Sequence, residues 1–151
     1  MRTFESLAEL LPLVGQELAT SEWVTISQKQ IDLFAEATGD HQWIHIDEER
    51  AKAGPFGSTI AHGFLTLSLL PKFFETALEI RNTRMGVNYG LNKVRFTAPV
   101  PAGSRLRARM TLLACESVAN DGMQMTWQVT VEREGSDKPV CVAESLTRRY
   151  P

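Results

Sequence analysis

The sequence predicts an α+β fold in which an antiparallel sheet wraps around one central apolar helix. Two observations support this prediction. Helix and turn signals dominate before about position 80, whereas the residues after about position 84 read as long strands. Between them, the stretch Ala61–Ile80 is apolar on nearly every side, which is typical of a helix buried in a core. A sheet on one side and such a helix on the other make a two-layer domain.

The first helix is expected to follow a short extended segment, Trp23–Ile26. The residues Ser27-Gln28-Lys29-Gln30 have the form of a capping box, with serine as the N-cap and glutamine three residues later. Apolar residues then recur at helical spacing up to Thr38. Gly39 ends the helix, because glycine adopts the left-handed conformation after a helix without strain.

A second, short helix and a glycine-rich loop lead to the central helix. Asp47 is the expected N-cap of the short helix Glu48–Lys52, which has acidic residues in its first turn. The loop covers residues 54–63. Pro71 lies inside the apolar stretch and is expected to kink or split the central helix.

The second half of the chain predicts a meander of strands. In Ser104–Ala114 and in Met123–Val131, apolar residues occupy every second position, as in strands with one face on a core and one in water. Asn120-Asp121-Gly122 between them is a hairpin turn signal. A last strand, Pro139–Tyr150, follows the turn Gly135-Ser136-Asp137.

Composition limits the class of protein. The chain has 151 residues, 43% hydrophobic and 23% charged, with a net charge of −2, so we expect one globular domain (1–151) that does not bind nucleic acid. No apolar run is long enough to span a membrane, and Glu5 and Glu9 interrupt the N-terminus where a signal peptide needs an apolar core. Cys115 and Cys141 lie among apolar residues, which favours reduced thiols and a cytoplasmic location.

The segment after the first helix holds a carboxylate and an imidazole that could share a pocket. Asp40 follows the helix-ending Gly39, and His45 comes five residues later, beyond the apolar pair Trp43-Ile44. Such a pair can hold one water between them and move a proton. Two structural roles remain open: Asp40 could only form an Asx-turn, and His45 could be a hydrogen-bonded core histidine.

All three histidines, His41, His45 and His62, lie close together in sequence, so a metal site was weighed. His41 and His45 have a spacing that would suit two ligands on a helix. Residues 41–45 are expected to be irregular, however, because one helix has just ended and another is about to begin. The sequence also has no HExxH pattern and no closely spaced pair of cysteines, and we expect no metal.

The start of the central helix is the second candidate feature. In Ala61-His62-Gly63, free N–H groups at the helix N-terminus could stabilise negative charge on a substrate oxygen, and glycine would allow its close approach. The alternative is that Gly63 only permits close packing. No phosphate-binding loop and no activated nucleophile is recognisable, so covalent catalysis is not expected.

Taken together, these residues resemble the MaoC-like family of (R)-specific enoyl-CoA hydratases, also called hydratase 2. The family motif is matched by Gly39-Asp40-x4-His45-x5-Ala51, and a second family segment by Ala61-His62-Gly63. The segments GDHQWIHID, GPFGSTIAHGFLTL and NYGLNKVRFTAPVP are similar to the single-domain branch that includes nodulation-protein-N-like proteins. The resemblance extends from about Trp23 to Tyr150; one departure is Trp43-Ile44, where many hydratases have Asn-Pro-Leu.

The resemblance implies a hotdog fold and a homodimer whose sheets join edge to edge. One hotdog unit alone is expected to need a partner subunit to complete the pocket. By analogy, Asp40 and His45 are catalytic: they activate a water that adds to C3 of a trans-2-enoyl thioester, and a proton goes to C2 on the same face. The product would be an (R)-3-hydroxyacyl-CoA. No cofactor is implied, because the CoA thioester is the substrate.

The same analogy suggests substrate-contacting residues and leaves two other functions open. The expected contacts are Gly63, whose N–H would polarise the thioester oxygen, and Ala61, His62, Tyr89 and Asn92. A hotdog acyl-CoA thioesterase is the first alternative, although hydrolysis does not require the second group of the Asp-x4-His pair. A non-catalytic acyl-thioester binder is the second. Acyl length, pathway, and CoA or acyl-carrier protein as the carrier stay open.

Overall fold

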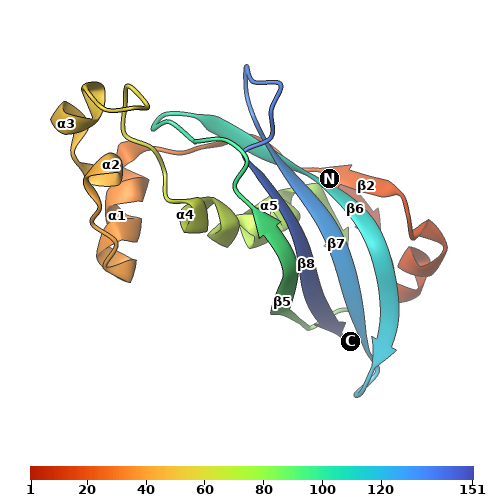
Figure 1. Cartoon of the computed structure of the whole chain (residues 1–151). Coiled ribbons are helices and arrows are strands. Elements are labelled where there is room, and N and C mark those ends of the chain that lie inside the picture. The colour runs from red at the N-terminus through yellow and green to blue at the C-terminus, as the bar shows by residue number, and fades with distance from the viewer.

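A curved antiparallel sheet forms one layer of the protein in the computed structural model, which describes residues 1–151 (Figure 1). Its strands are β2 (Glu17–Thr20), β3 (Val24–Thr25), β5 (Met85–Arg95), β6 (Arg105–Val118), β7 (Gly122–Arg133) and β8 (Cys141–Tyr150). They lie in the order β2-β6-β7-β8-β5, and β3 also pairs with β6. The expected α+β architecture is confirmed, and β5 is left as an edge strand.

The alternating pattern of β6 and β7 is confirmed as the basis of the sheet. Along β7, Met125, Trp127, Val129 and Val131 are buried, and the even-numbered residues between them mostly face outward. The hairpin turn is confirmed by two residues in the left-handed region, with φ of 61° at Asn120 and 56° at Asp121. A turn with positive φ at both central positions matches the right-handed twist of the strands.

Three helices precede the central helix and lie to the left of the sheet in Figure 1: α1 (Gln28–Thr38), α2 (Trp43–Ile46) and α3 (Glu48–Lys52). The capping prediction is confirmed, because Ser27 Oγ accepts a hydrogen bond from Gln30 N (3.1 Å) and Gly39 has φ of 80°. Asp47 caps α3 as expected. The expectation of irregular backbone at 41–45 is wrong in part, because α2 completes one helical turn there.

The central helix is split into α4 (Gly63–Ser68) and α5 (Leu70–Ala77), as Pro71 led us to expect. Pro71 lies in the first turn of α5, where its missing N–H costs nothing. The helical stretch is shorter than expected, because Leu78–Ile80 forms strand β4 and pairs in parallel with β1 (Arg2–Phe4). This pairing with the N-terminus has no signal in the local sequence.

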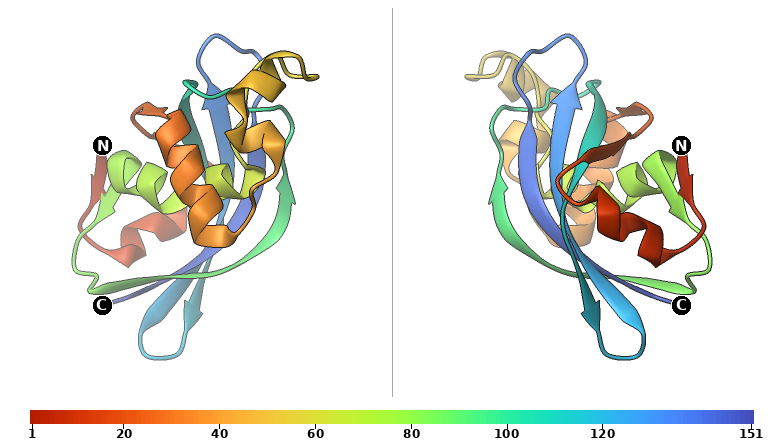
Figure 2. Two further views of the ribbon diagram at one scale, coloured as in Figure 1. Left: turned by 90° about the vertical axis from the view of Figure 1, so that its left-hand side faces the viewer. Right: turned by 90° about the vertical axis from the view of Figure 1, so that its right-hand side faces the viewer.

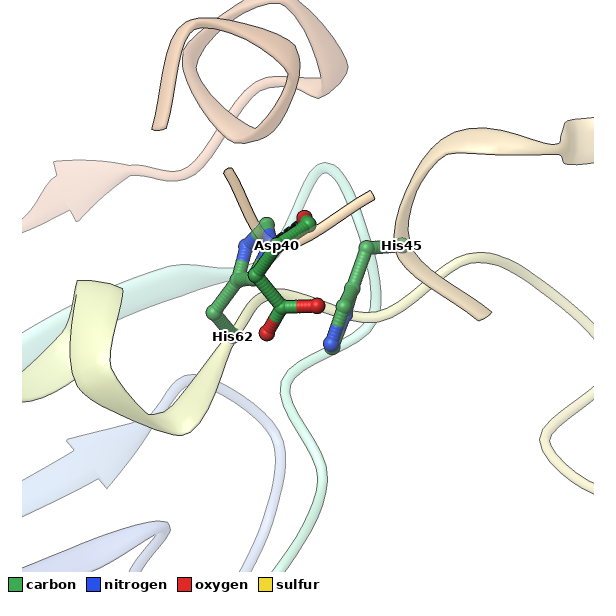
Figure 3. A group of neighbouring side chains, drawn as sticks. All are labelled: Asp40, His45 and His62. Atoms are coloured by element: carbon green, nitrogen blue, oxygen red, sulfur yellow. Dashed lines mark hydrogen bonds between the residues drawn. The ribbon is translucent and has the colours of Figure 1, made fainter. Parts of the chain in front are cut away.

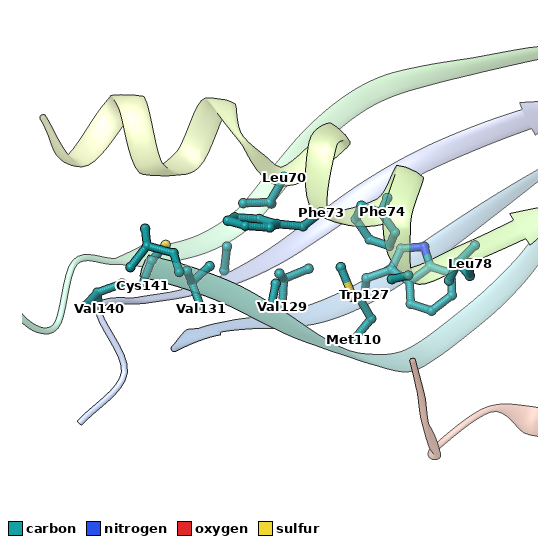
Figure 4. Packing of buried hydrophobic residues seen from close by; sticks show 14 of the residues in the cluster. Leu70, Phe73, Phe74, Leu78, Met110, Trp127, Val129, Val131, Val140 and Cys141 are labelled. Atoms are coloured by element: carbon teal, nitrogen blue, oxygen red, sulfur yellow. The ribbon is translucent and has the colours of Figure 1, made fainter. Parts of the chain in front are cut away.

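The core lies between α5 and the concave face of the sheet. Phe73 is fully buried, and the Phe74 ring packs edge-on against Trp127, with ring centroids 5.3 Å apart (Figure 4). The expectation that the central helix lacks an exposed side is wrong: Phe64 is 69% exposed, and Lys72 and Glu75 face solvent. One side of the helix is therefore largely exposed to solvent, although the Phe64 ring packs edge-on against Phe96.

The N-terminal segment, for which the sequence indicated no structure, closes the remaining side of the core. It contains the 3-10 helix η1 (Leu7–Leu13), whose Leu10 is fully buried. The two views in Figure 2 show this segment beside the sheet, with α1–α3 gathered at one end. None of the helices combines the length and the apolar character that a membrane crossing requires.

Candidate active site

Asp40 lies directly after α1, where the left-handed Gly39 turns the chain. Its Oδ1 accepts a hydrogen bond from Gln42 N (3.3 Å), so the Asx-turn considered as an alternative is present. The same side chain also lies close to two imidazoles. One ligand atom each of Asp40, His45 and His62 lies within 4.8 Å of the others (Figure 3). The Asx-turn therefore does not prevent the Asp40 carboxylate from interacting with the two imidazoles.

His45 lies on the one-turn helix α2, and a hydrogen bond of its ring fixes the tautomer. The ring is 6% exposed, and its Nδ1 lies 2.7 Å from the carbonyl oxygen of Ile60. Because a carbonyl can only accept, Nδ1 carries the hydrogen and Nε2 keeps a free lone pair. A backbone hydrogen bond from Ile60 N to Ile44 O (3.0 Å) and one from Gln28 Nε2 to His45 O (2.8 Å) hold α2 in place.

Burial keeps His45 neutral near neutral pH. The pKa of His45 is lowered from its usual value of 6.5, chiefly because burial removes water from the charged form. The hydrogen bond to Ile60 opposes this shift, and the nearby His62 adds to it. The unprotonated Nε2 is therefore available to accept a hydrogen bond or a proton.

His62 lies behind the Asp40–His45 pair. It is 2% exposed, and its Nε2 donates a hydrogen bond to the backbone carbonyl of Asp40 (2.9 Å). Its ring stacks on the His45 ring, with centroids 3.8 Å apart. Its Nδ1 is buried and has no partner. These contacts position Asp40 and His45; a direct contact of His62 with substrate stays a prediction.

The histidine grouping differs from the one weighed from sequence. His41 is exposed and lies outside the cluster, and Asp40 takes its place beside His45 and His62. A cation bound here would contact one carboxylate and two imidazoles. Each imidazole has one ring nitrogen that makes no hydrogen bond to the backbone. The absence of a metal stays a prediction.

Gly63 is the first residue of α4, and its N–H takes part in no hydrogen bond. A Cβ at this position would lie 2.7 Å from the Phe96 ring, so only glycine fits beneath that ring. The packing role considered from sequence is therefore real. It leaves the N–H free to serve as a hydrogen-bond donor at the positive end of a helix turn.

A cavity of about 350 Å³ lies beside His45 and Gly63. Its walls include His45, Ala61 and Gly63, three of the residues named from sequence. Phe56 and Phe96, each 44% exposed, also line it and were missed. Both are aromatic residues in loops between elements, and an exposed aromatic side chain in a loop was the one signal that could have drawn attention to them.

Tyr89 and Asn92 lie elsewhere within the chain. Tyr89 is 55% exposed on β5, with the Arg148 guanidinium 3.4 Å from its ring centroid. Asn92 Nδ2 donates to Glu144 Oε1 (2.6 Å). The structure brings neither residue to the Asp40–His45 cluster of the same chain, and their contact with substrate stays a prediction.

Comparisons with known proteins agree with the resemblance seen in the sequence. The model of the MaoC-like domain matches residues 9–134. The chain is 57% identical over 148 residues to 3-hydroxyacyl-thioester dehydratase Z of Mycobacterium tuberculosis, covering 98% of both chains. It is 50% identical over 144 residues to nodulation protein N of Rhizobium leguminosarum, covering 94% of this chain and 89% of that protein. The R-hydratase PhaJ1 of Pseudomonas aeruginosa superposes with a TM-score of 0.72 at 27% identity, covering 96% and 85% of the two chains.

Proposed function

The chain belongs to the MaoC-like domain family and is a hydro-lyase, and from that premise we propose that it interconverts trans-2-enoyl-CoA and (R)-3-hydroxyacyl-CoA by reversible addition of water. Its fold is a hotdog fold, the architecture shared with the R-hydratase structure. The observation that carries the proposal is that His45, whose Nε2 is free, and Gly63, whose N–H is free, line one cavity, while the Asp40 carboxylate lies beside His45.

In the proposed hydration, a water donates one hydrogen bond to the Asp40 carboxylate and one to Nε2 of His45. Both groups are acceptors, because His45 is neutral and its hydrogen is committed to Ile60. As the water oxygen attacks C3, Asp40 takes one of its protons and then passes that proton to C2 on the same face. The hydroxyl stays on C3, both residues return to their starting state, and dehydration is the reverse.

Gly63 supplies the stabilisation of charge in this proposal. Attack at C3 moves negative charge through the conjugated system onto the thioester oxygen. Gly63 lines the same cavity as His45, and its free N–H can donate a hydrogen bond to that oxygen. An N–H donor fixed at the start of a helix needs no rearrangement during the reaction.

The experiment that tests the function is turnover of thioesters by the purified protein. With trans-2-crotonyl-CoA we expect loss of the enoyl absorbance, an (R)-3-hydroxy product on chiral analysis, and no release of free thiol. Thiol release without hydration would identify a thioesterase instead. Ligand-induced stabilisation without either reaction would identify a passive acyl-thioester binder. Enoyl thioesters of acyl-carrier protein and of longer chains, assayed in parallel, define the carrier and the acyl length.

The acid limb of the pH–rate profile is expected to lie below 6.5. Hydration requires the neutral His45, and burial lowers the pKa of that imidazole, so the active form persists to lower pH than an exposed histidine would allow. The value of kcat/KM should hold as pH falls through 6.5 and decline only as it passes the lowered pKa. A limb at or above 6.5 would contradict the neutral, desolvated imidazole. His45→Gln should be poorly active and lack this limb.

A homodimer is the second part of the proposal, with residues 1–151 forming one domain per subunit. Edge strand β5 is exposed along nearly its whole length, including the apolar side chains of Met85, Val87 and Leu91. An eleven-residue edge strand with exposed apolar side chains invites pairing with another strand, and a second copy of β5 would satisfy it. Asp40 is exposed in the single chain, so a partner would also exclude water from the catalytic pair.

We expect Leu91→Lys to weaken the dimer. The native protein should sediment with twice the 16.9 kDa chain mass, and the added charge on β5 should shift it toward the single-chain mass. Leu33→Lys is the matched control, because Leu33 is 56% exposed on α1 and away from β5. Sedimentation equilibrium on the three proteins decides the question. A native protein that remains a single chain at micromolar concentration would refute the proposed dimer.

A cytoplasmic location is supported by the two cysteines. Cys115 and Cys141 are free thiols, and burial raises the pKa of Cys141 to about 11. A thiol with so high a pKa is unreactive at neutral pH and suits a small apolar residue in the core.

A further inference from the structure

Arg149 is an arginine without a partner on the concave face of the sheet. It lies at the end of β8, near the C-terminus, and its side chain forms no ion pair and no hydrogen bond. Its Nη1 lies over the β5 backbone at Gly86, where a Cβ would be only 2.6 Å away. Removal of water lowers the pKa of Arg149, although the group stays charged.

Several arginines on the outer face of the sheet have side-chain partners. Arg107 and Arg109 both contact Glu132, at 2.9 and 2.6 Å, and Arg105 contacts Glu134 at 2.8 Å. Arg105, Arg107 and Arg109 thus have carboxylate partners, whereas the partly desolvated Arg149 has none. An uncompensated charge in such surroundings is costly unless a ligand neutralises it.

Arg149 faces a cavity of about 230 Å³ between α5 and the sheet. Most of the residues that line it are apolar, among them Phe74, Leu78 and Trp127, which Figure 4 shows packed together. Thr147 and Asn88 are the other polar side chains that line it. The cavity has no acidic residue in its wall. It lies at the α5 end of the central helix, whereas Asp40, His45 and Gly63 lie at the α4 end.

We propose that this cavity binds a carboxylate carried on a short apolar chain, with the carboxylate on Arg149 and the chain against Phe74 and Trp127. The planar guanidinium matches a carboxylate in two parallel hydrogen bonds. The apolar wall favours a hydrocarbon over a sugar or nucleotide, and the small volume, below the roughly 300 Å³ of typical ligand pockets, limits its length. The site does not depend on the proposed hydratase activity.

Calorimetric titration of the whole protein with hexanoate and with hexan-1-ol tests the site. We expect hexanoate to bind at least about tenfold more tightly, because only the acid forms charge-assisted hydrogen bonds to Arg149. Arg149→Gln should abolish the difference, and Arg149→Lys, which keeps the charge, should retain part of it. Arg148→Gln removes the same charge from the neighbouring residue on the opposite face, where Arg148 bonds to Gln124, and should bind hexanoate like the native protein.

Three outcomes would overturn the proposal: equal affinity for acid and alcohol, unchanged hexanoate binding by Arg149→Gln, or an equal loss in Arg148→Gln. Circular dichroism of each variant excludes unfolding as the cause of a loss.

A second experiment, on the kinetics of thioester turnover, distinguishes the source of the carboxylate. If the carboxylate is the far end of a substrate acyl chain, Arg149→Gln lowers kcat/KM for an enoyl thioester that carries a terminal carboxylate. The same variant then leaves kcat/KM unchanged for the matched neutral thioester. If both substrates are unaffected while hexanoate binding is lost, the carboxylate is a separate ligand.

Discussion

Asp40→Asn is expected to lower kcat for hydration by ~10³–10⁴-fold while the protein stays folded. The amide cannot take a proton from the attacking water. It can still accept the hydrogen bond from Gln42 N that closes the Asx-turn, because that bond uses only a side-chain oxygen. The bond from His62 ends on the Asp40 backbone carbonyl and survives the change. The measurement is enoyl absorbance loss together with a thermal unfolding curve.

Asp47→Asn is the matched control for this variant. Asp47 lies seven residues further on, is exposed, and caps α3 by accepting a hydrogen bond from Arg50 N (3.0 Å), a role that asparagine also fills. It should therefore leave both rate and stability nearly unchanged. Native rates in Asp40→Asn, with the control behaving as expected, would remove Asp40 from the mechanism.

Gly63→Ala is expected to lower kcat/KM by ~10²–10³-fold, the usual loss when one oxyanion donor is displaced. The new Cβ would meet the Phe96 ring at 2.7 Å, so either the ring or the start of α4 must shift. A shift of α4 moves the N–H away from the thioester oxygen. A shift of Phe96 alone changes the cavity wall, which should raise KM and leave kcat largely intact. Steady-state kinetics thus separates the two responses.

Combining Gly63→Ala with Phe96→Leu tests the steric cause. The smaller side chain removes the ring that the Cβ would meet, so the double variant should recover much of the lost kcat. Phe96→Leu alone should affect mainly KM, because Phe96 lines the cavity without offering a hydrogen bond. If the double variant is as slow as Gly63→Ala, the contact with Phe96 is not what limits residue 63 to glycine.

Local signals predicted most of the fold and the proximity of Asp40 and His45. Ser27 and Gly39 bound α1 through interactions within a few residues, and the two-residue alternation of β7 depends only on which face is buried. Asp40 and His45 are five positions apart, so one turn of chain brings them together.

Contacts between distant segments escaped prediction for a physical reason. The tautomer of His45 depends on Ile60, fifteen residues away, and the steric demand on Gly63 comes from Phe96. β4 exists because the N-terminal residues pair with it. The absence of a partner for Arg149 depends on all the elements that pack around it. None of these follows from periodicity or spacing, because each depends on which surfaces the folded chain brings together.

The position of α1–α3 at one end of the sheet has a consequence for inactivation by heat. These helices contact one another more than they contact the strands, whereas the core lies under α5. Asp40 and His45 lie in this helical unit, which contributes Ile31 to the core cluster, and Gly63 begins the element that joins it to the rest of the core. Local melting of that unit would disperse the proton-transfer groups while the sheet stayed intact. If Asp40 and His45 act as proposed, the catalytic lifetime would depend on the packing of α1–α3 and not only on the stability of the sheet.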